Sequence, residues 1–339
     1  MDSHRQRYMP QFLTDILERL RGARSRLSAS SAESLQADLI RFIPWIVGVL
    51  LFVLVIYYPI GMVIYARVDD DVDLKPPSAY APQGGSAAVA MTAAVVSREA
   101  NEWIANKPFW HPAAALDNGP NFQLGIIYAA SRFTIELGDY LGRARGSSAI
   151  DDNLDKAVGL LKYDGRIWTW GQGNIIPMTK AETNYKQAVE YLVAYNREVA
   201  AGKATYSPRA DNLIAFLDRV ISDLGSTRAT IDSAASVAGG YFDFEADDVF
   251  YSAKGKLYGY YVIMNALGDD IRPVIKEKQA DVLWANLMTS LRQGASFEPL
   301  IIVNGKRDSL MMPSHLTTLG FELASARIQM TELRDTLQK

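Results

Sequence analysis

An acidic and aromatic segment is the part of this sequence best suited to chemistry. Residues 241–248 (YFDFEADD) place four carboxylates beside three aromatic rings. Paired carboxylates are the usual catalytic groups of glycoside hydrolases, and a turn-rich loop at 168–174 adds two tryptophans to a candidate ligand groove. That groove comprises Trp168, Trp170, Tyr241, Asp243, Glu245, Asp247 and Asp248. We favour a plainer alternative, in which Asp243 or Glu245 caps the next helix while the aromatic rings pack.

The chain has few residues that could bind a metal or act as a nucleophile. It has no cysteine, which excludes disulfides, thiolate metal sites and a cysteine nucleophile. Its three histidines, His4, His111 and His315, are far apart in the sequence, and two isolated histidines need carboxylates from elsewhere to hold a metal. The acidic run 69–73 could bind a divalent cation, but such a run is more often solvated. We therefore expect no catalytic set, no metal site and no cofactor.

The longest apolar stretch predicts a transmembrane helix at residues 42–66. No residue from Phe42 to Ala66 is charged, and a helix of that length exceeds the roughly 30 Å hydrocarbon core of a bilayer. Trp45 and Tyr65 lie near its ends, where amphipathic rings favour the interface. Pro59 predicts a kink near the far end. A buried core helix and a cleaved signal peptide are the alternatives, and the length of the uncharged run argues against both.

Positive charge near this helix predicts its orientation. The N-terminal side has four arginines within about 20 residues of the helix, whereas the C-terminal side has Arg67 and Lys75 diluted by the acidic run. The positive-inside rule then keeps residues 1–41 in the cytoplasm, as an arm that includes a basic amphipathic helix. The rest faces outward, into the periplasm of a Gram-negative bacterium. We predict a single-pass inner-membrane protein.

The remaining sequence predicts an all-α extracytoplasmic domain. Residues 67–87 are rich in Pro, Gly and Asp and are expected to form a linker, and residues 88–339 are expected to form the helical domain. Ser207 and Pro208 resemble a helix start, and Gly225 interrupts the apolar stripe that follows. One segment, residues 297–303, suggests an extended strand. Helices are predicted at 88–106, 121–142, 149–162, 180–201, from 208 onward, and at 246–267, 270–293 and 315–337.

The last predicted helix has a heptad-like apolar seam. Its spacings alternate between three and four residues, which is typical of helix packing or self-association. Because Phe321 and Ile328 lie off the seam, a wide core-facing stripe is favoured over a free coiled coil. The seam comprises Leu316, Leu319, Leu323, Ala326, Met330, Leu333 and Leu337.

Four stretches of the chain resemble one bacterial family. They are LGRARGSSAIDDNL, PRADNLIAFLDRVISDLGST, FDFEADDVFYSAKGKLYGYY and MMPSHLTTLGFELASARIQMTELRDTL. Over about residues 88–337 they resemble domain-of-unknown-function family 2333, whose members similarly carry one membrane span. The resemblance implies a proteobacterial inner-membrane protein and supplies no activity or catalytic residue.

These observations lead to one expected function and one alternative. Lys and Arg (35) nearly balance Asp and Glu (38), which argues against a nucleic-acid binder. The expected partners are the lipid bilayer and either another envelope protein or a second copy of the chain. We expect a non-enzymatic interaction or assembly module, as a subunit or scaffold of an inner-membrane complex. The alternative is a periplasmic glycan-binding protein or hydrolase that uses the acidic and aromatic groove.

Overall fold

The computed structural model describes residues 42–141, 150–170, 176–237, 243–299, 301–305 and 313–339. The predicted cytoplasmic arm, 1–41, and the groove residue Tyr241 lie outside these ranges. The chain divides into two compact units, Met1–Gly61 and Met62–Lys339.

The apolar stretch forms one helix, Phe42–Tyr65, that is long and apolar enough to cross a membrane. Its side chains are almost all exposed, unlike those of a core helix. The helix widens into a π-helical turn at Val53–Tyr57 and continues as α2, Tyr58–Tyr65. Pro59 lies two residues after the π turn, and because proline cannot donate the usual hydrogen bond to the residue four positions earlier, a local departure from α geometry is expected in that turn.

The second unit is helical, as predicted. Its described residues contain no strand, only an isolated bridge between Asn304 and Ser314 close to the predicted extended segment. The helices are α3 (Ala87–Asn101), α4 (Asn118–Glu136), α5 (Asp152–Leu161), α6 (Ala181–Ala200), α7 (Ala210–Ser236), α8 (Phe244–Asp270), α9 (Arg272–Glu277), α10 (Asp281–Ala295) and α11 (His315–Leu337).

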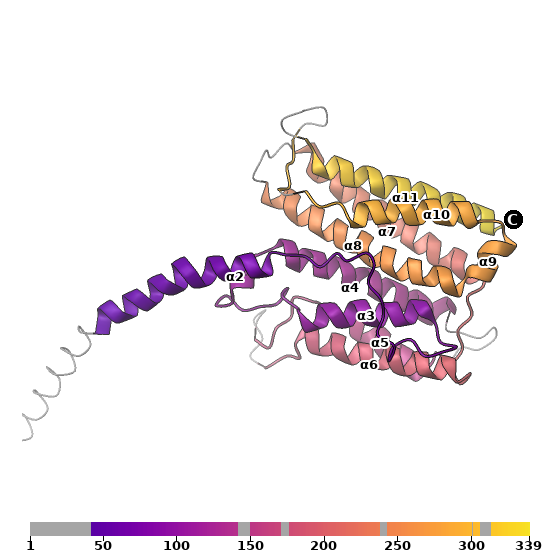
Figure 1. The fold of residues 1–339 in the computed structure, drawn as a ribbon, viewed down its shortest axis with the longest axis horizontal. Helices are drawn as coiled ribbons and strands as arrows, with labels where there is room; N and C mark the ends of the chain where they lie inside the picture. Colours follow the sequence, from indigo (N-terminus) through magenta and orange to yellow (C-terminus); the bar gives the residue numbers. More distant parts are fainter. Residues whose placement is uncertain (1–41, 142–149, 171–175, 238–242, 300, 306–312) are drawn as a thin grey trace, which may run out of the picture. The chain divides into compact units, whose positions relative to one another are not determined.

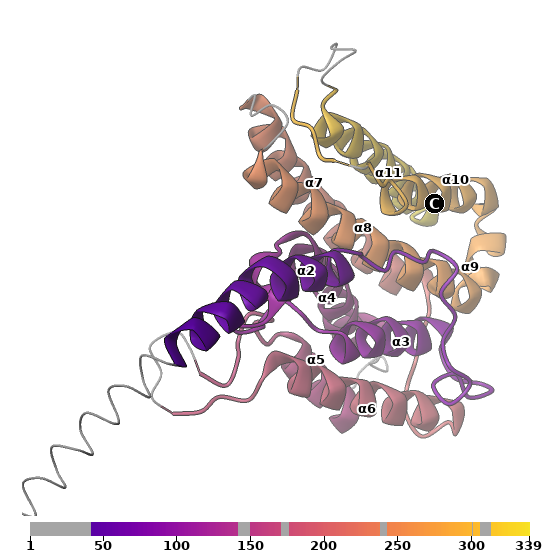
Figure 2. The ribbon, with the colours of Figure 1, turned by 60° about the vertical axis from the view of Figure 1, so that its left-hand side comes forward.

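These helices form two halves around a central pair. Figure 1 and Figure 2 both show α3, α5 and α6 on one side of α4 and α8, with α7, α10 and α11 on the other side. The contact between α4 and α8 is the most extensive in the unit, followed by those of α7 with α11 and α3 with α6. One continuous apolar core runs through both halves.

Glycines allow the central pair to approach closely. A Cβ atom at Gly255 of α8 would collide with the backbone oxygen of Phe122, and one at Gly125 of α4 would lie 2.5 Å from the backbone oxygen of Ser252. Backbone atoms cannot move aside as a side chain can, so only glycine fits at these two positions.

The helix predicted at 270–293 is divided into α9 and α10 by a turn at 278–280. Two details of the helix predicted from residue 208 onward are also wrong. Helix α7 begins at Ala210 with Arg209 as its N-cap, so Ser207 and Pro208 do not start it. It then runs without a break through Gly225 to Ser236. Tertiary packing explains the second error, because the buried face of α7 continues past the glycine to Thr227 and Ile231.

The close α4–α8 contact predicts a large effect of one methyl group. Replacing Gly255 by Ala should lower the free energy of unfolding by about 3 kcal/mol, because the added Cβ must push two backbones apart. Thermal unfolding of the detergent-solubilised full chain measures this. The matched control is Gly159→Ala, at an exposed position in α5 with open space around it, which should stabilise by about 0.5 kcal/mol. Equal effects of the two substitutions would contradict the proposed packing.

Candidate functional site

The predicted linker is docked on the helical unit along most of its length. We call residues 67–86 the strap. Asp70 forms an ion pair with Lys254 of α8, whose side chain is fully buried, with Nζ 2.7 Å from Oδ2. Lys254 Nζ has no hydrogen-bond partner, so charge holds this pair. The expectation that the acidic run is solvated therefore fails at Asp70, although it holds at the exposed Asp73.

Further contacts fix both ends of the strap. Near its start, the Tyr258 hydroxyl donates to the backbone oxygen of Asp71 at 2.7 Å, and Arg98 forms an ion pair with Asp69 at 3.1 Å. At its end, Ser86 caps α3 and donates its hydroxyl proton to Asp270, the last residue of α8. The Asp270 carboxylate also accepts the backbone N–H groups of Ala87 and Ala88. Helix α8 therefore holds the strap at two points.

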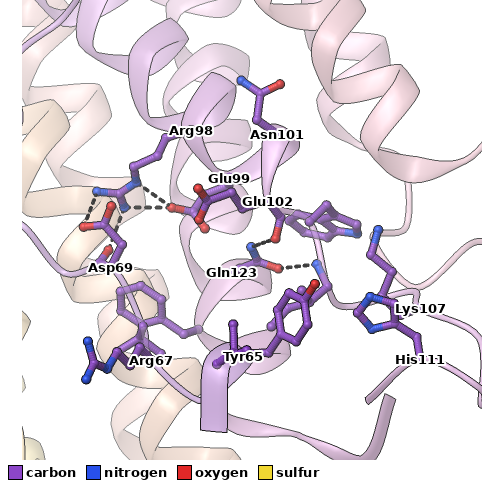
Figure 3. A pocket seen from close by; sticks show the side chains of 16 residues that line it. Tyr65, Arg67, Asp69, Arg98, Glu99, Asn101, Glu102, Lys107, His111 and Gln123 are labelled. Atoms are coloured by element: carbon purple, nitrogen blue, oxygen red, sulfur yellow. Dashed lines mark hydrogen bonds and ion pairs between the residues drawn. The ribbon is translucent and has the colours of Figure 1, made fainter. Parts of the chain in front are cut away.

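This docking forms a pocket of about 480 Å³ between the start of the strap, α3 and α4. It lies next to the last turn of the apolar helix, because Ile64 and Tyr65 form part of its wall. Figure 3 shows the polar side chains that face it. They come from the strap (Arg67, Asp69), from α3 and the loop after it (Arg98, Glu99, Asn101, Glu102, Lys107, His111) and from α4 (Gln123).

The inner wall of the pocket is rigid and polar. Gln123 accepts a hydrogen bond from the Ile104 backbone N–H at 2.9 Å and donates to the Glu102 backbone oxygen at 3.0 Å, which fixes its amide. Glu99 is buried and accepts from Arg98 at 2.7 Å. Burial raises the pKa of Glu99 above its ordinary value, while the Arg98 cation acts in the opposite direction.

The outer part of the pocket is more basic. Figure 3 shows Lys107 and His111 on one side of the Tyr65 ring and Arg67 on the other. The imidazole of His111 lies 4.9 Å from the Tyr65 ring. Burial, and then the nearby Lys107 cation, lower the pKa of His111, which favours the neutral form of this imidazole. Such a pocket can bind a ligand whose negative charge lies at the pocket entrance and whose hydrogen-bonding groups reach the inner wall.

Two carboxylates of the predicted groove lie at the start of α8. Asp243 is the N-cap, accepting from the Ala246 backbone N–H at 3.1 Å, and it also accepts from the Asn304 amide at 2.8 Å. Glu245 is exposed in the first turn. The capping alternative for Asp243 thus matches the structure.

The other two carboxylates face the start of α4. Asp248 accepts from the Asn121 amide at 2.7 Å. The Asn118 amide, oriented with its nitrogen toward the acids, donates to Asp247 at 2.7 Å and to Asp117 at 3.1 Å. Burial and the nearby Asp117 raise the pKa of Asp247 to about 6. These contacts join α8 to α4.

The two predicted tryptophans differ in their surroundings. Trp168 packs edge-on against Trp110, with ring centres 5.5 Å apart, and Lys180 lies over its ring at 5.9 Å. Trp170 is exposed. Trp168 therefore lies against the loop at 109–110. Of the four acids, Asp243 caps α8, Asp247 and Asp248 accept from amides of α4, and Glu245 is exposed.

The heptad-like seam of α11 is internal. All seven of its residues are buried, where α11 packs against α7 and α10. The seam serves packing, and self-association through it would require the domain to open. The exposed apolar residues of α11 are Phe321 and Ile328, which lie off the seam.

The two histidines within the described ranges serve as local hydrogen-bond acceptors. His111 accepts from the Ala113 backbone N–H at 3.2 Å, and His315 accepts from that of Val303 at 3.0 Å. In those ranges no group of three or more His, Asp or Glu side chains is arranged to hold a metal.

Sequence reasoning did not identify the pocket. One signal was available: Arg98 and Glu99 are adjacent charges in an otherwise alanine-rich helix, and buried charges need partners. No sequence pattern linked them to Gln123 or to the strap.

Comparison with known proteins gives one match. The model of a family described as "Uncharacterized protein conserved in bacteria (DUF2333)" matches residues 45–243 and 242–339. Neither the curated proteins nor the solved structures contain a match.

Proposed function

This chain belongs to the DUF2333 family of proteins conserved in bacteria, and on that premise we propose that it is a single-pass membrane protein and a non-enzymatic interaction module. The helix Phe42–Tyr65 crosses the bacterial inner membrane, with the N-terminus in the cytoplasm and the helical domain in the periplasm. The module is a subunit or scaffold of an inner-membrane complex, and binds its partner beside the bilayer.

The membrane location rests on the apolar helix, and the orientation rests on the arginine-rich segment before it. A soluble domain would gain nothing from a helix of 24 residues whose apolar side chains face outward. In a bilayer the same apolar side chains contact lipid instead of water. The helix can lie there because its backbone polar groups are hydrogen-bonded to one another.

The interaction site we propose is the pocket beside Tyr65, and its fixed position is the observation that carries the proposal. The strap holds the pocket next to the last turn of the helix, so any ligand in it is held at the membrane surface. A volume of about 480 Å³ is within the range of specific binding sites. Its basic entrance, with Arg67 and Lys107, fits an acidic segment of another membrane protein.

The orientation is tested by thiol labelling, because the chain has no cysteine of its own. A single cysteine at the exposed position Val282 should react with a membrane-impermeant maleimide in intact spheroplasts. A cysteine at Ser3, in the N-terminal arm, should react only after the membrane is permeabilised. Reversed labelling of the two positions would contradict the proposed orientation.

The pocket as a partner site is tested by photo-crosslinking in the native host. A benzophenone amino acid in place of Lys107 should give one discrete adduct in isolated membranes, because this side chain lies at the entrance. The control is the same amino acid in place of Val282 on α10, which should not give that adduct. An adduct of twice the chain's mass identifies a second copy as the partner. Absence of any adduct specific to Lys107 would refute the proposed site.

A further inference from the structure

Three exposed aromatic side chains and the half-buried Trp168 form an edge on the helical unit. We call Phe109, Trp110, Trp168 and Trp170 the aromatic edge. The rings of Phe109 and Trp110 are 5.1 Å apart, and Trp110 contacts Trp168 at 5.5 Å. Phe109 is 81% exposed, and Trp110 and Trp170 are each 53% exposed. Large rings gathered with this much exposure mark a contact surface.

The position of the aromatic edge identifies what it contacts. Trp110 precedes His111, whose ring lies 4.9 Å from Tyr65. Tyr65 is the last residue of the helix proposed to cross the membrane, so it lies where the bilayer meets water. The aromatic edge begins one residue away from that contact. The strap prevents the domain from moving away, because Asp70 and the start of α3 are both held by α8.

We propose that the aromatic edge inserts into the interfacial layer of the same bilayer that the helix crosses. This inference rests on the proposed membrane anchoring. Tryptophan is the side chain most typical of that layer, since its ring is apolar while its indole N–H can hydrogen-bond. The charges beside the edge fit as well: Lys107 precedes Phe109 by two residues, and Lys180 lies over the Trp168 ring. Both can approach lipid phosphates while the rings lie deeper.

The inserted edge would give the domain a second attachment to the membrane. The helix alone fixes one point and leaves rotation about its axis open. Contact through the edge fixes which side of the domain faces the lipid, and it therefore orients the pocket entrance relative to the bilayer. The exposed Phe321 of α11, on the other half of the unit, is expected to remain in water.

Spin labelling of the full chain tests this inference. Single cysteines replace Phe109, Trp170 or, as a matched control, Phe321, which is 64% exposed. Each variant is labelled with a nitroxide and reconstituted into phosphatidylcholine–phosphatidylglycerol vesicles. Collision rates are measured with oxygen, which concentrates in lipid, and with a nickel chelate, which stays in water. Labels at 109 and 170 should collide several-fold less with nickel, and more with oxygen, than the label at 321.

Two results would overturn the inference. Equal access of nickel to positions 109 and 321 would place the edge in water. Shielding of 109 and 170 from both oxygen and nickel would mean that protein, not lipid, covers the edge. An alkaline carbonate wash of the same vesicles tests the membrane helix separately. If the chain stays in the vesicles while position 109 is in water, the insertion of the aromatic edge is refuted and the proposed membrane anchoring is not. Two labelled positions are used so that one misfolded variant does not decide the outcome.

Discussion

The ion pair between Lys254 and Asp70 is the interaction on which the arrangement of this protein depends. Lys254 is fully buried on α8, and an ammonium group without a partner there would cost several kcal/mol. Asp70 can reach it only if the strap lies across α8. The C-terminal end of α8 supplies Asp270. Its carboxylate accepts the hydroxyl proton of Ser86 and the backbone N–H groups of Ala87 and Ala88 at the start of α3. One helix thus fixes both ends of a segment whose composition suggests a loose linker.

The consequences of this docking reach both proposed contact surfaces. With the strap in place, Tyr65 lies against His111 and beside α3 and α4, which closes one wall of the pocket. The same contact determines the position of the aromatic edge, because Trp110 directly precedes His111 in the sequence. The close approach of α4 and α8 at Gly255 stabilises this docking. Gly255 directly follows Lys254, so the buried ammonium group belongs to a part of α8 that is packed rigidly against α4. A flexible tether would leave both surfaces without a defined position relative to Tyr65.

Local patterns in the sequence were enough to predict the fold class but not the site. The uncharged run from Phe42 and the helical spacing of apolar residues are patterns that act within a few residues, so the all-α class and most helix positions were predictable. The errors have long-range causes. Asp70 looks solvated because its partner is 184 positions later, and α7 continues through Gly225 because packing outweighs intrinsic propensity. The pocket joins residues from three separate segments, and no spacing rule connects them.

The central claim is that the end of the apolar helix is fixed to the domain by the strap. Nitroxides at Ala66→Cys and Val282→Cys in the reconstituted full chain measure this directly by pulsed electron–electron double resonance. The docked strap predicts one narrow distance distribution, which broadens when Asp70→Asn removes the charge that holds Lys254. A broad distribution with Asp70 intact would mean that the domain swings freely on its anchor, and it would contradict the account.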